Sequence, residues 1–131
     1  MRAVIVDDSS ATRRMLAGIL AATPVSVIGE AGDAAAALDV CRELKPDLLF
    51  LDVVMPGATG LELLAAIRQE LPSVRVLMVT SISERETVRA SRDLGASGYI
   101  LKPFERERIV TQVNRLCEDA AGGQPEEEPE P

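Results

Sequence analysis

Residues 48–60, LLFLDVVMPGATG, decide the fold that we expect for this chain. The apolar run at 48–51 predicts a short strand buried on both faces, as in a parallel sheet. The run ends abruptly in Asp52, and Pro56 and Gly57 mark a turn soon after it. A charge at the tip of a core strand is unfavourable unless it is solvated, paired or bound to a metal. Asp52 is therefore a candidate site residue, although a solvated aspartate that starts a turn explains this stretch alone equally well.

The same alternation of a short apolar run and a helical pattern occurs five times in the 131 residues. Buried strands are expected at 3–6, 25–30, 48–51, 74–79 and 98–101. Helices are expected to follow them at 9–22, 33–44, 60–70, 84–94 and 105–117. Strand-then-helix units joined by short turns predict a doubly wound α/β fold, a parallel sheet with helices on both faces. In such a sheet the ligand site lies outside the carboxyl ends of the strands.

Composition and charge exclude several classes of function. Hydrophobic residues make up 47% of the chain and aromatic residues only 2%, which predicts a core of Val, Ile, Leu and Ala. Four of the last eight residues are glutamates, and without them the formal net charge falls from −7 to −3. The body therefore has no basic excess for phosphate contacts, and we expect no nucleic-acid partner. The sequence contains no His, which excludes His-ligated zinc, Ser-His-Asp hydrolysis and His-based acid–base catalysis.

The two ends and the two cysteines also carry information. The first apolar run begins almost at Met1 and no run is long enough to span a membrane, so we expect a cytoplasmic protein without a signal peptide. Cys41 and Cys117 lie at apolar helical positions and are expected to be small buried residues. We place one domain at 1–118 and an acidic tail rich in Pro and Glu at 119–131. We expect the tail to be disordered, with a specific docking role as the alternative.

Polar side chains stand at the carboxyl ends of four of the five expected strands. Asp7 and Asp8 follow the first strand, Asp52 follows the third, Thr80 ends the fourth and Lys102 follows the fifth. Each residue alone has a simple structural explanation as a helix cap, a turn residue or a strand end. Because parallel strands end at one edge of the sheet, we expect these groups to lie close together.

Three carboxylates in one pocket repel each other and predict a bound cation. Oxygen donors without His or Cys suit Mg²⁺, which is held by one or two carboxylates, keeps waters and leaves positions for a phosphate. A metal, the Lys102 ammonium and the Thr80 hydroxyl around Asp52 indicate a phosphoryl-transfer site. We expect Asp52 to attack phosphorus as the nucleophile and to form an aspartyl phosphate.

These motifs resemble those of the receiver domain, the phosphoacceptor module of two-component response regulators. The resemblance rests on Asp7-Asp8, Asp52 with Met55-Pro56-Gly57, Thr80-Ser81, and Gly98-Tyr99-Ile100-Leu101-Lys102-Pro103-Phe104. It covers residues 1–118 and is nearest in form to single-domain chemotaxis regulators of the CheY type. It implies a flavodoxin-like fold with strand order 2-1-3-4-5. It also implies a phosphoacceptor that catalyses its own phosphorylation and dephosphorylation, and not an enzyme.

The resemblance implies a role for each acidic residue. Asp52 would accept a phosphoryl group from a phosphohistidine on a sensor histidine kinase. Asp8, Asp52 and the backbone carbonyl of Val54 would bind Mg²⁺, with Asp7 acting mostly through water.

The remaining motif residues would serve contact and switching. Lys102 would contact the phosphoryl group, and the Lys102-Pro103 peptide bond would be cis. The Thr80 hydroxyl would donate to a phosphate oxygen, drawing the loop after the fourth strand inward and letting the Tyr99 ring turn in behind it. This movement would change the surface formed by residues 84–118, where we expect a downstream effector such as a flagellar switch protein. The helix at 84–94 has a thin apolar face, which suits a movable element.

Two positions that vary within this family are apolar here, namely Val54, two residues after Asp52, and Ile82, two residues after Thr80. Neither side chain can orient a hydrolytic water, so we expect a long-lived phosphorylated form.

Other functions fit the sequence less well. A Mg²⁺-dependent phosphohydrolase of the haloacid-dehalogenase-like kind would need an Asp where Val54 stands. A nucleotide-binding protein would need a glycine-rich phosphate loop, and Asp-Asp-Ser-Ser follows the first strand instead. Within the receiver interpretation we favour a stand-alone regulator over a receiver domain excised from a multidomain regulator.

Overall fold

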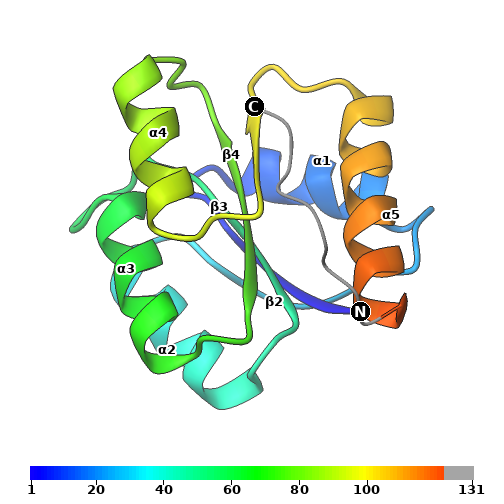
Figure 1. Cartoon of the computed structure of the whole chain (residues 1–131), viewed down its shortest axis with the longest axis horizontal. Coiled ribbons are helices and arrows are strands. Elements are labelled where there is room, and N and C mark those ends of the chain that lie inside the picture. The colour runs from blue at the N-terminus through cyan, green and yellow to red at the C-terminus, as the bar shows by residue number, and fades with distance from the viewer. Residues whose placement is uncertain (123–131) are drawn as a thin grey trace.

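The computed structural model describes residues 1–122, which form a five-stranded sheet between two layers of helices (Figure 1). The strands are β1 (Arg2–Val6), β2 (Ser26–Ala31), β3 (Leu48–Leu51), β4 (Arg75–Thr80) and β5 (Gly98–Leu101). The helices are α1 (Ser10–Leu20), α2 (Ala34–Leu44), α3 (Gly60–Glu70), α4 (Arg85–Asp93) and α5 (Arg106–Gly122). Strands and helices alternate along the chain, as the sequence predicts.

All neighbouring strands are parallel, in the order β2-β1-β3-β4-β5, which confirms the predicted flavodoxin-like topology. In the centre of the sheet, Val6 is paired with Leu51, and Leu51 with Met78. The carboxyl ends of β1, β3 and β4 therefore lie next to each other at one edge. The strand order reverses between β1 and β3, so residues after these two strands flank the crevice where doubly wound folds bind ligands.

The alternation of side chains along each strand builds a separate core on each face of the sheet. In β1, Ala3 and Ile5 face the layer of α1 and α5, whereas Val4 and Val6 face the layer that contains α2 and α3. Figure 1 shows α1 and α5 on one side of the sheet and α2, α3 and α4 on the other. Because β1, β3 and β4 are buried on both faces, their sequences are almost continuously apolar.

Several details differ from the sequence-based expectations or refine them. Ser9 is the N-cap of α1, and its side chain accepts a hydrogen bond from the Thr12 N–H. Cys41 is fully buried as predicted, whereas Cys117, in the second half of α5, is only partly buried. Among residues 1–122, no helix has both the length and the apolar character needed to cross a membrane.

The last helix is longer than its apolar pattern indicates. We expected this helix to end at residue 117, but α5 continues to Gly122 because nothing in the sequence before Gly122 breaks a helix. The rest of the predicted disordered tail, residues 123–131, lies outside the described residues.

Candidate functional site

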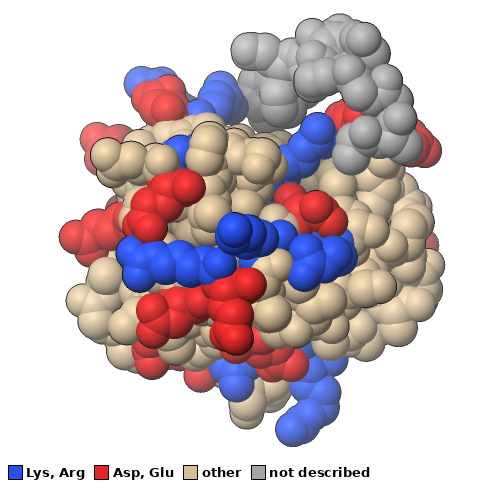
Figure 2. All heavy atoms as spheres, turned by 90° about the horizontal axis from the view of Figure 1, so that it is seen from below, with Lys and Arg blue, Asp and Glu red and all other residues tan. Residues whose placement is uncertain are grey.

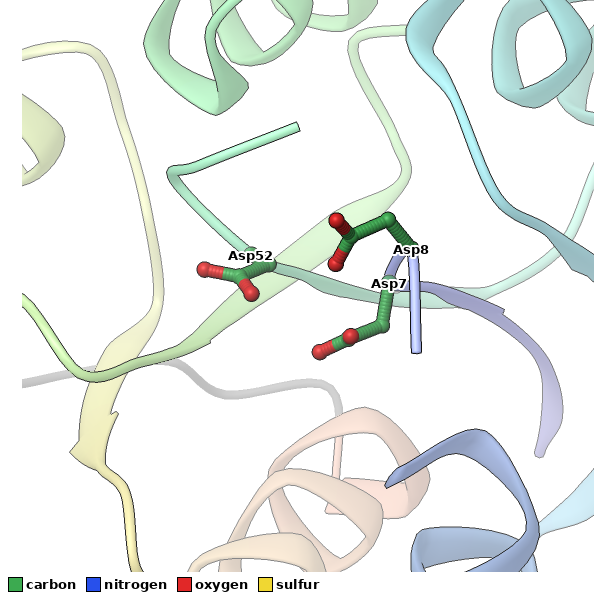
Figure 3. Close-up of side chains that lie close together, drawn as sticks. All are labelled: Asp7, Asp8 and Asp52. Atoms are coloured by element: carbon green, nitrogen blue, oxygen red, sulfur yellow. The ribbon is translucent and has the colours of Figure 1, made fainter. Parts of the chain in front are cut away.

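Three carboxylates meet at the carboxyl edge of the sheet. Asp7 and Asp8 follow β1, and Asp52 follows β3. One oxygen atom from each carboxylate lies within 4.8 Å of the others. Figure 3 shows the three side chains grouped at the two strand ends, with the Asp7 and Asp8 carboxylates extending toward Asp52. Asp7 and Asp52 are almost fully buried at 3% and 6% exposure, whereas Asp8 is exposed. The site is therefore an acidic cluster in which two carboxylates are buried and Asp8 faces solvent.

Lys102 supplies the positive charge that holds the two buried carboxylates together. Its Nζ atom lies 2.7 Å from Oδ2 of Asp7 and 2.8 Å from Oδ2 of Asp52. Lys102 follows β5 at the edge of the sheet, so its long side chain reaches across the end of β4 to these groups. The Lys102–Pro103 peptide bond is cis. Lys102 thus contacts residues 95 and 50 positions earlier in the chain.

The pKa values follow from this bridge. Burial alone raises the pKa of Asp52, but Lys102, the Thr80 hydroxyl and the Val54 N–H outweigh it and hold the pKa below its ordinary value. Burial alone lowers the pKa of Lys102, but hydrogen bonds to Asp52 and Asp7 reverse the effect and raise it. At neutral pH Asp52 is therefore an ionised carboxylate, the form that a nucleophile requires.

Local backbone contacts fix the orientation of the two buried carboxylates. Oδ1 of Asp7 accepts the Ser9 N–H at 2.9 Å, and Oδ1 of Asp52 accepts the Val54 N–H at 3.2 Å. In each case one carboxylate oxygen starts a turn and the other faces Lys102. Asp7 and Asp52 therefore have both roles that the sequence allowed: each starts a turn, and each is part of the carboxylate cluster.

A glycine allows the loop after β3 to fold back against Asp52. The Gly60 N–H donates to the Val53 carbonyl at 2.7 Å. A Cβ atom at position 60 would overlap the backbone carbonyl of Asp52 and would lie 2.7 Å from Cα of Val53. Only glycine therefore fits where α3 begins, directly behind the candidate phosphoacceptor.

The two expected switch residues meet at the backbone of Ile82. Oγ1 of Thr80 accepts the Ile82 N–H at 3.3 Å, and the Tyr99 hydroxyl donates to the Ile82 carbonyl at 2.7 Å. Thr80 is fully buried beside Asp52, and the Tyr99 ring packs against the core layer on the α3 side. A chain of contacts thus leads from the acidic cluster through the loop after β4 to β5.

Arg13 is a contributor that sequence reasoning did not single out. From α1, its Nη1 donates to the Asp7 carbonyl at 2.5 Å and its Nε pairs with Glu30 of β2 at 2.8 Å. It thereby anchors the backbone that carries Asp7 and Asp8. The sequence around Arg13 did not indicate this role, because only the packing of α1 beside β2 brings Arg13 close to Glu30 and to the Asp7 carbonyl.

The donor set fits a hard divalent cation. Three carboxylates converge, one of them exposed, and the described site residues include neither a His nor a Cys ligand. Lys102 already balances the charge of Asp7 and Asp52, whereas Asp8 has no cationic partner among residues 1–122. Asp8 is therefore the one carboxylate of the three whose charge is not already balanced, and the cluster as a whole suits Mg²⁺.

Comparison with known proteins gives the family. A family model described as "Response regulator receiver domain" matches residues 3–114. The chain belongs to the response regulator receiver family. It is 30% identical to the chemotaxis protein CheY of Thermotoga maritima over 115 residues, which cover 88% of this chain and 96% of the relative.

Solved structures agree with this assignment. The receiver domain of the response regulator NarL from Mycobacterium tuberculosis is 36% identical, with a TM-score of 0.79 and coverage of 94% of this chain and 97% of the other. CheY of Borrelia burgdorferi, solved with CheX, BeF₃ and Mg²⁺, is 26% identical, with a TM-score of 0.85 and coverage of 89% of each chain.

Membership sets the general function. This chain is a CheY-like receiver domain of a two-component system. Receiver domains are phosphoacceptor regulators and in general are not conventional enzymes. Receiver domains bind Mg²⁺ at an acidic site and interact with histidine kinases and downstream effectors. The particular residues that do so here are the subject of the proposal below.

Proposed function

We propose that Asp52 accepts a phosphoryl group from a phosphohistidine of a sensor histidine kinase in a Mg²⁺-dependent reaction. The observation that carries this proposal is the environment of Asp52, a buried, ionised carboxylate at a strand end, 2.8 Å from Lys102 and within reach of Asp7 and Asp8. In the transfer, an Asp52 carboxylate oxygen forms a bond to phosphorus while the phosphorus–nitrogen bond to the kinase histidine breaks. The electron pair of that bond leaves with the imidazole, which takes up a proton.

The acidic residues would divide the metal and charge roles. Asp8, Asp52 and the Val54 carbonyl would hold Mg²⁺, with Asp7 acting mostly through water. When bound, the metal would neutralise charge on the phosphoryl oxygens. Lys102 lies beside Asp52 and would contact the phosphoryl group. This contact would replace the present ion pair between Lys102 and Asp52.

The Thr80 and Tyr99 contacts would carry the signal outward. Phosphorylation adds roughly one to one and a half negative charges to the cluster. The Thr80 hydroxyl would turn toward a phosphoryl oxygen, and the Ile82 backbone that it contacts would move with it. Tyr99, which bonds to the same residue, would then shift β5 and α4. The changed surface within residues 84–118 would bind a downstream effector, either a flagellar switch protein in a chemotaxis pathway or a partner in a related signalling pathway.

The direct test is intact mass after incubation with acetyl phosphate, with and without Mg²⁺. Wild type is expected to gain the mass of one phosphoryl group only when Mg²⁺ is present, and Asp52→Asn is expected to gain none. Asp39→Asn is the matched control, because Asp39 is exposed on α2 and is not a member of the carboxylate cluster. A Mg²⁺-independent gain, or a gain that survives in Asp52→Asn, would contradict the proposal.

The lifetime of the phosphorylated form is a second, separable property. Val54 is 55% exposed, whereas Ile82 is partly buried against the core. Neither side chain can hydrogen-bond to water, so we propose slow hydrolysis of the aspartyl phosphate. After removal of acetyl phosphate, mass spectra over time should show slow loss in wild type and faster loss in Val54→Asn and Ile82→Glu. A wild-type half-life of only seconds at room temperature would refute slow hydrolysis.

A further inference from the structure

A groove of about 1120 Å³ follows the exposed edge of the sheet, where β5 lies between α4 and α5. Although the whole chain is acidic, this groove is rich in cations. Five arginines line it, namely Arg68, Arg75, Arg92, Arg108 and Arg115. The carboxylates of the lining are Glu105, Glu107 and Asp119. The groove therefore has an excess of positive charge on a molecule whose formal net charge is −7.

These arginines are not neutralised by their neighbours. Within the part of the chain that the structure describes, none of the five forms an ion pair with a carboxylate. Nη1 of Arg75 donates only to the backbone carbonyl of Leu116, at 3.3 Å.

Arg68 is the most informative of the five. Its side chain packs beneath Gly95, so that a Cβ atom on Gly95 would lie 2.9 Å from Cδ of Arg68. Its Nε and Nη2 atoms are buried and have no hydrogen-bond partner among the described residues. Burial also lowers the pKa of this guanidinium. A buried charged donor without an acceptor is costly, so Arg68 indicates a missing anion at this place.

The groove runs from the first turn of α5, where Arg108 lies, toward the edge of the molecule where α5 ends. Each helix runs back from the carboxyl edge of the sheet, so the last turns of α3, α4 and α5 lie toward the opposite edge. Arg68 and Arg92 lie in the last turns of α3 and α4, and Arg75 is the first residue of β4. Figure 1 shows the end of α5 at this edge, near the N-terminus. Figure 2 looks at this edge, and Lys and Arg side chains form a band across it.

We propose that the acidic segment after α5 docks in this groove of the same chain. The segment carries Glu126, Glu127, Glu128 and Glu130, with no Lys or Arg among residues 123–131. At about 3.5 Å per residue, an extended chain leaving Gly122 brings Glu126 within roughly 14 Å and Glu130 within roughly 28 Å of the helix end. Asp119 and Arg115 of α5 line the groove themselves, so the segment starts where the groove begins. Its carboxylates would pair with the free guanidiniums and supply an acceptor beside Arg68.

A second hollow at the same edge is a weaker candidate for these glutamates. It measures about 680 Å³ and is lined by Lys45, Arg75 and Asp47, with Met1 and Cys117. It offers fewer side-chain cations than the groove, and Arg68 does not line it. The groove therefore has both the greater charge complementarity and the unsatisfied donor.

Docking in the groove would cover the face that includes Tyr99 and α4 residues Val88 and Ser91. The acidic segment would then compete with an effector for this surface. This consequence rests on the proposed function, whereas the docking itself needs neither Mg²⁺ nor phosphorylation.

The test is paramagnetic relaxation in the full chain without Mg²⁺ or phosphodonor. A nitroxide is attached at Pro129→Cys in a Cys117→Ser background, where the remaining Cys41 is fully buried and its pKa is raised to about 11. Backbone amides at 91–99 and 111–115 are expected to lose most of their intensity. The loss should disappear when the four glutamates are changed to Gln, and in about 1 M NaCl, where the Debye length is only about 3 Å.

Matched arginine variants assign the docking surface. Arg92→Gln with Arg108→Gln should restore the intensities, whereas Arg14→Gln with Arg89→Gln should not, because these two exposed arginines do not line the groove. Loss centred on residues 45–47 would assign the segment to the second hollow and overturn the proposal. A loss of intensity that grows with protein concentration would mean that the segment binds a second copy of the chain. No loss would mean that the segment does not bind the groove. Either result would also overturn the proposal. Phosphoryl uptake by Asp52 is measured separately, so either proposal can fail alone.

Discussion

Helices α3 and α4 lie on the same face of the sheet, yet the chain holds them in different ways (Figure 1). Helix α3 buries Gly60, Leu63, Leu64 and Ile67, and Thr59 with Glu62 forms a capping box at its start. Helix α4 buries only Ser91, and Glu84 at its N-cap makes no side-chain hydrogen bond to the helix. Helix α3 follows Asp52 and α4 follows Thr80. One helix layer can therefore contain a firmly packed helix, α3, after the candidate phosphoacceptor and a weakly packed helix, α4, after the candidate switch residue.

The largest contrast is expected between the apolar contacts of the two helices. Leu64 of α3 is fully buried, whereas Val88 of α4 is only partly buried. Leu64→Ala should lower the free energy of unfolding by about 3 to 4 kcal/mol, and Val88→Ala by about 1 kcal/mol or less. Urea unfolding of both variants measures the difference. Equal losses would show that α4 is held as firmly as α3.

A smaller loss of stability, with a loss of function, is expected at the start of α3. Gly60→Ala places a Cβ against the Asp52 carbonyl and should lower the unfolding free energy by about 2 kcal/mol while reducing phosphoryl uptake from acetyl phosphate. Gly18→Ala is the matched control, because a Cβ at that position in α1 has no atom within 4 Å. The control should gain about 0.5 to 1 kcal/mol and take up phosphate normally. Normal uptake in Gly60→Ala would refute the supporting role of this loop.

Substitutions at the two N-caps should reduce the difference in stability between α3 and α4, one by weakening α3 and the other by strengthening α4. Thr59→Ala removes the capping box of α3 and should lower the unfolding free energy by about 1 kcal/mol. Glu84→Ser places a capping hydroxyl at an N-cap whose backbone is already extended, and should stabilise α4 by about 0.5 kcal/mol. Amide hydrogen exchange should become slower in α4 of the second variant. Unchanged exchange would mean that the missing cap does not limit α4.

The smallest effect is expected from the ion pair that ties α3 to α2. Arg42 donates to Glu70 at 2.8 and 2.9 Å, and within residues 1–122 no such pair joins α4 to another helix. The hydrogen bond from Arg42 holds the pKa of Glu70 below its ordinary value of 4.5. Because the folded-state pKa is lowered, the stabilisation is present above pH 4.5 and is lost as the pH falls through the folded-state value.

Thermal unfolding of Glu70→Gln measures this contribution. Its Tm should lie slightly below that of wild type at pH 7, and the gap should close as the pH falls below 4.5. Glu43→Gln is the control, since Glu43 is exposed on the same helix as Arg42 and forms no ion pair with a described residue. A gap that persists at low pH would show that the substitution of Glu70 acts through something other than the loss of its charge.

Much of the candidate site could be predicted because its residues sit at positions with a local signature. The apolar run before Asp52 and the Asp7-Asp8 pair mark strand ends, and parallel topology then brings them together. Arg13 and Arg68 carry no such signature. Arg13 acts through Glu30 and Asp7, and Arg68 through its packing beneath Gly95, and these partners are defined only when α1 meets β2 and α3 meets the turn before β5.

The sequence by itself determined the five strand-then-helix units, the burial of the central strands and the polar residue types at their carboxyl ends. These follow from hydrophobic periodicity and turn residues, which act over a few neighbouring positions. Only the tertiary structure decided that Lys102 bridges Asp7 and Asp52, that Gly60 lies against the Asp52 carbonyl, and that five arginines from α3, β4, α4 and α5 share one groove. Distances of a few ångströms between residues far apart in the chain depend on how the helices pack on the sheet, and no local pattern encodes that packing.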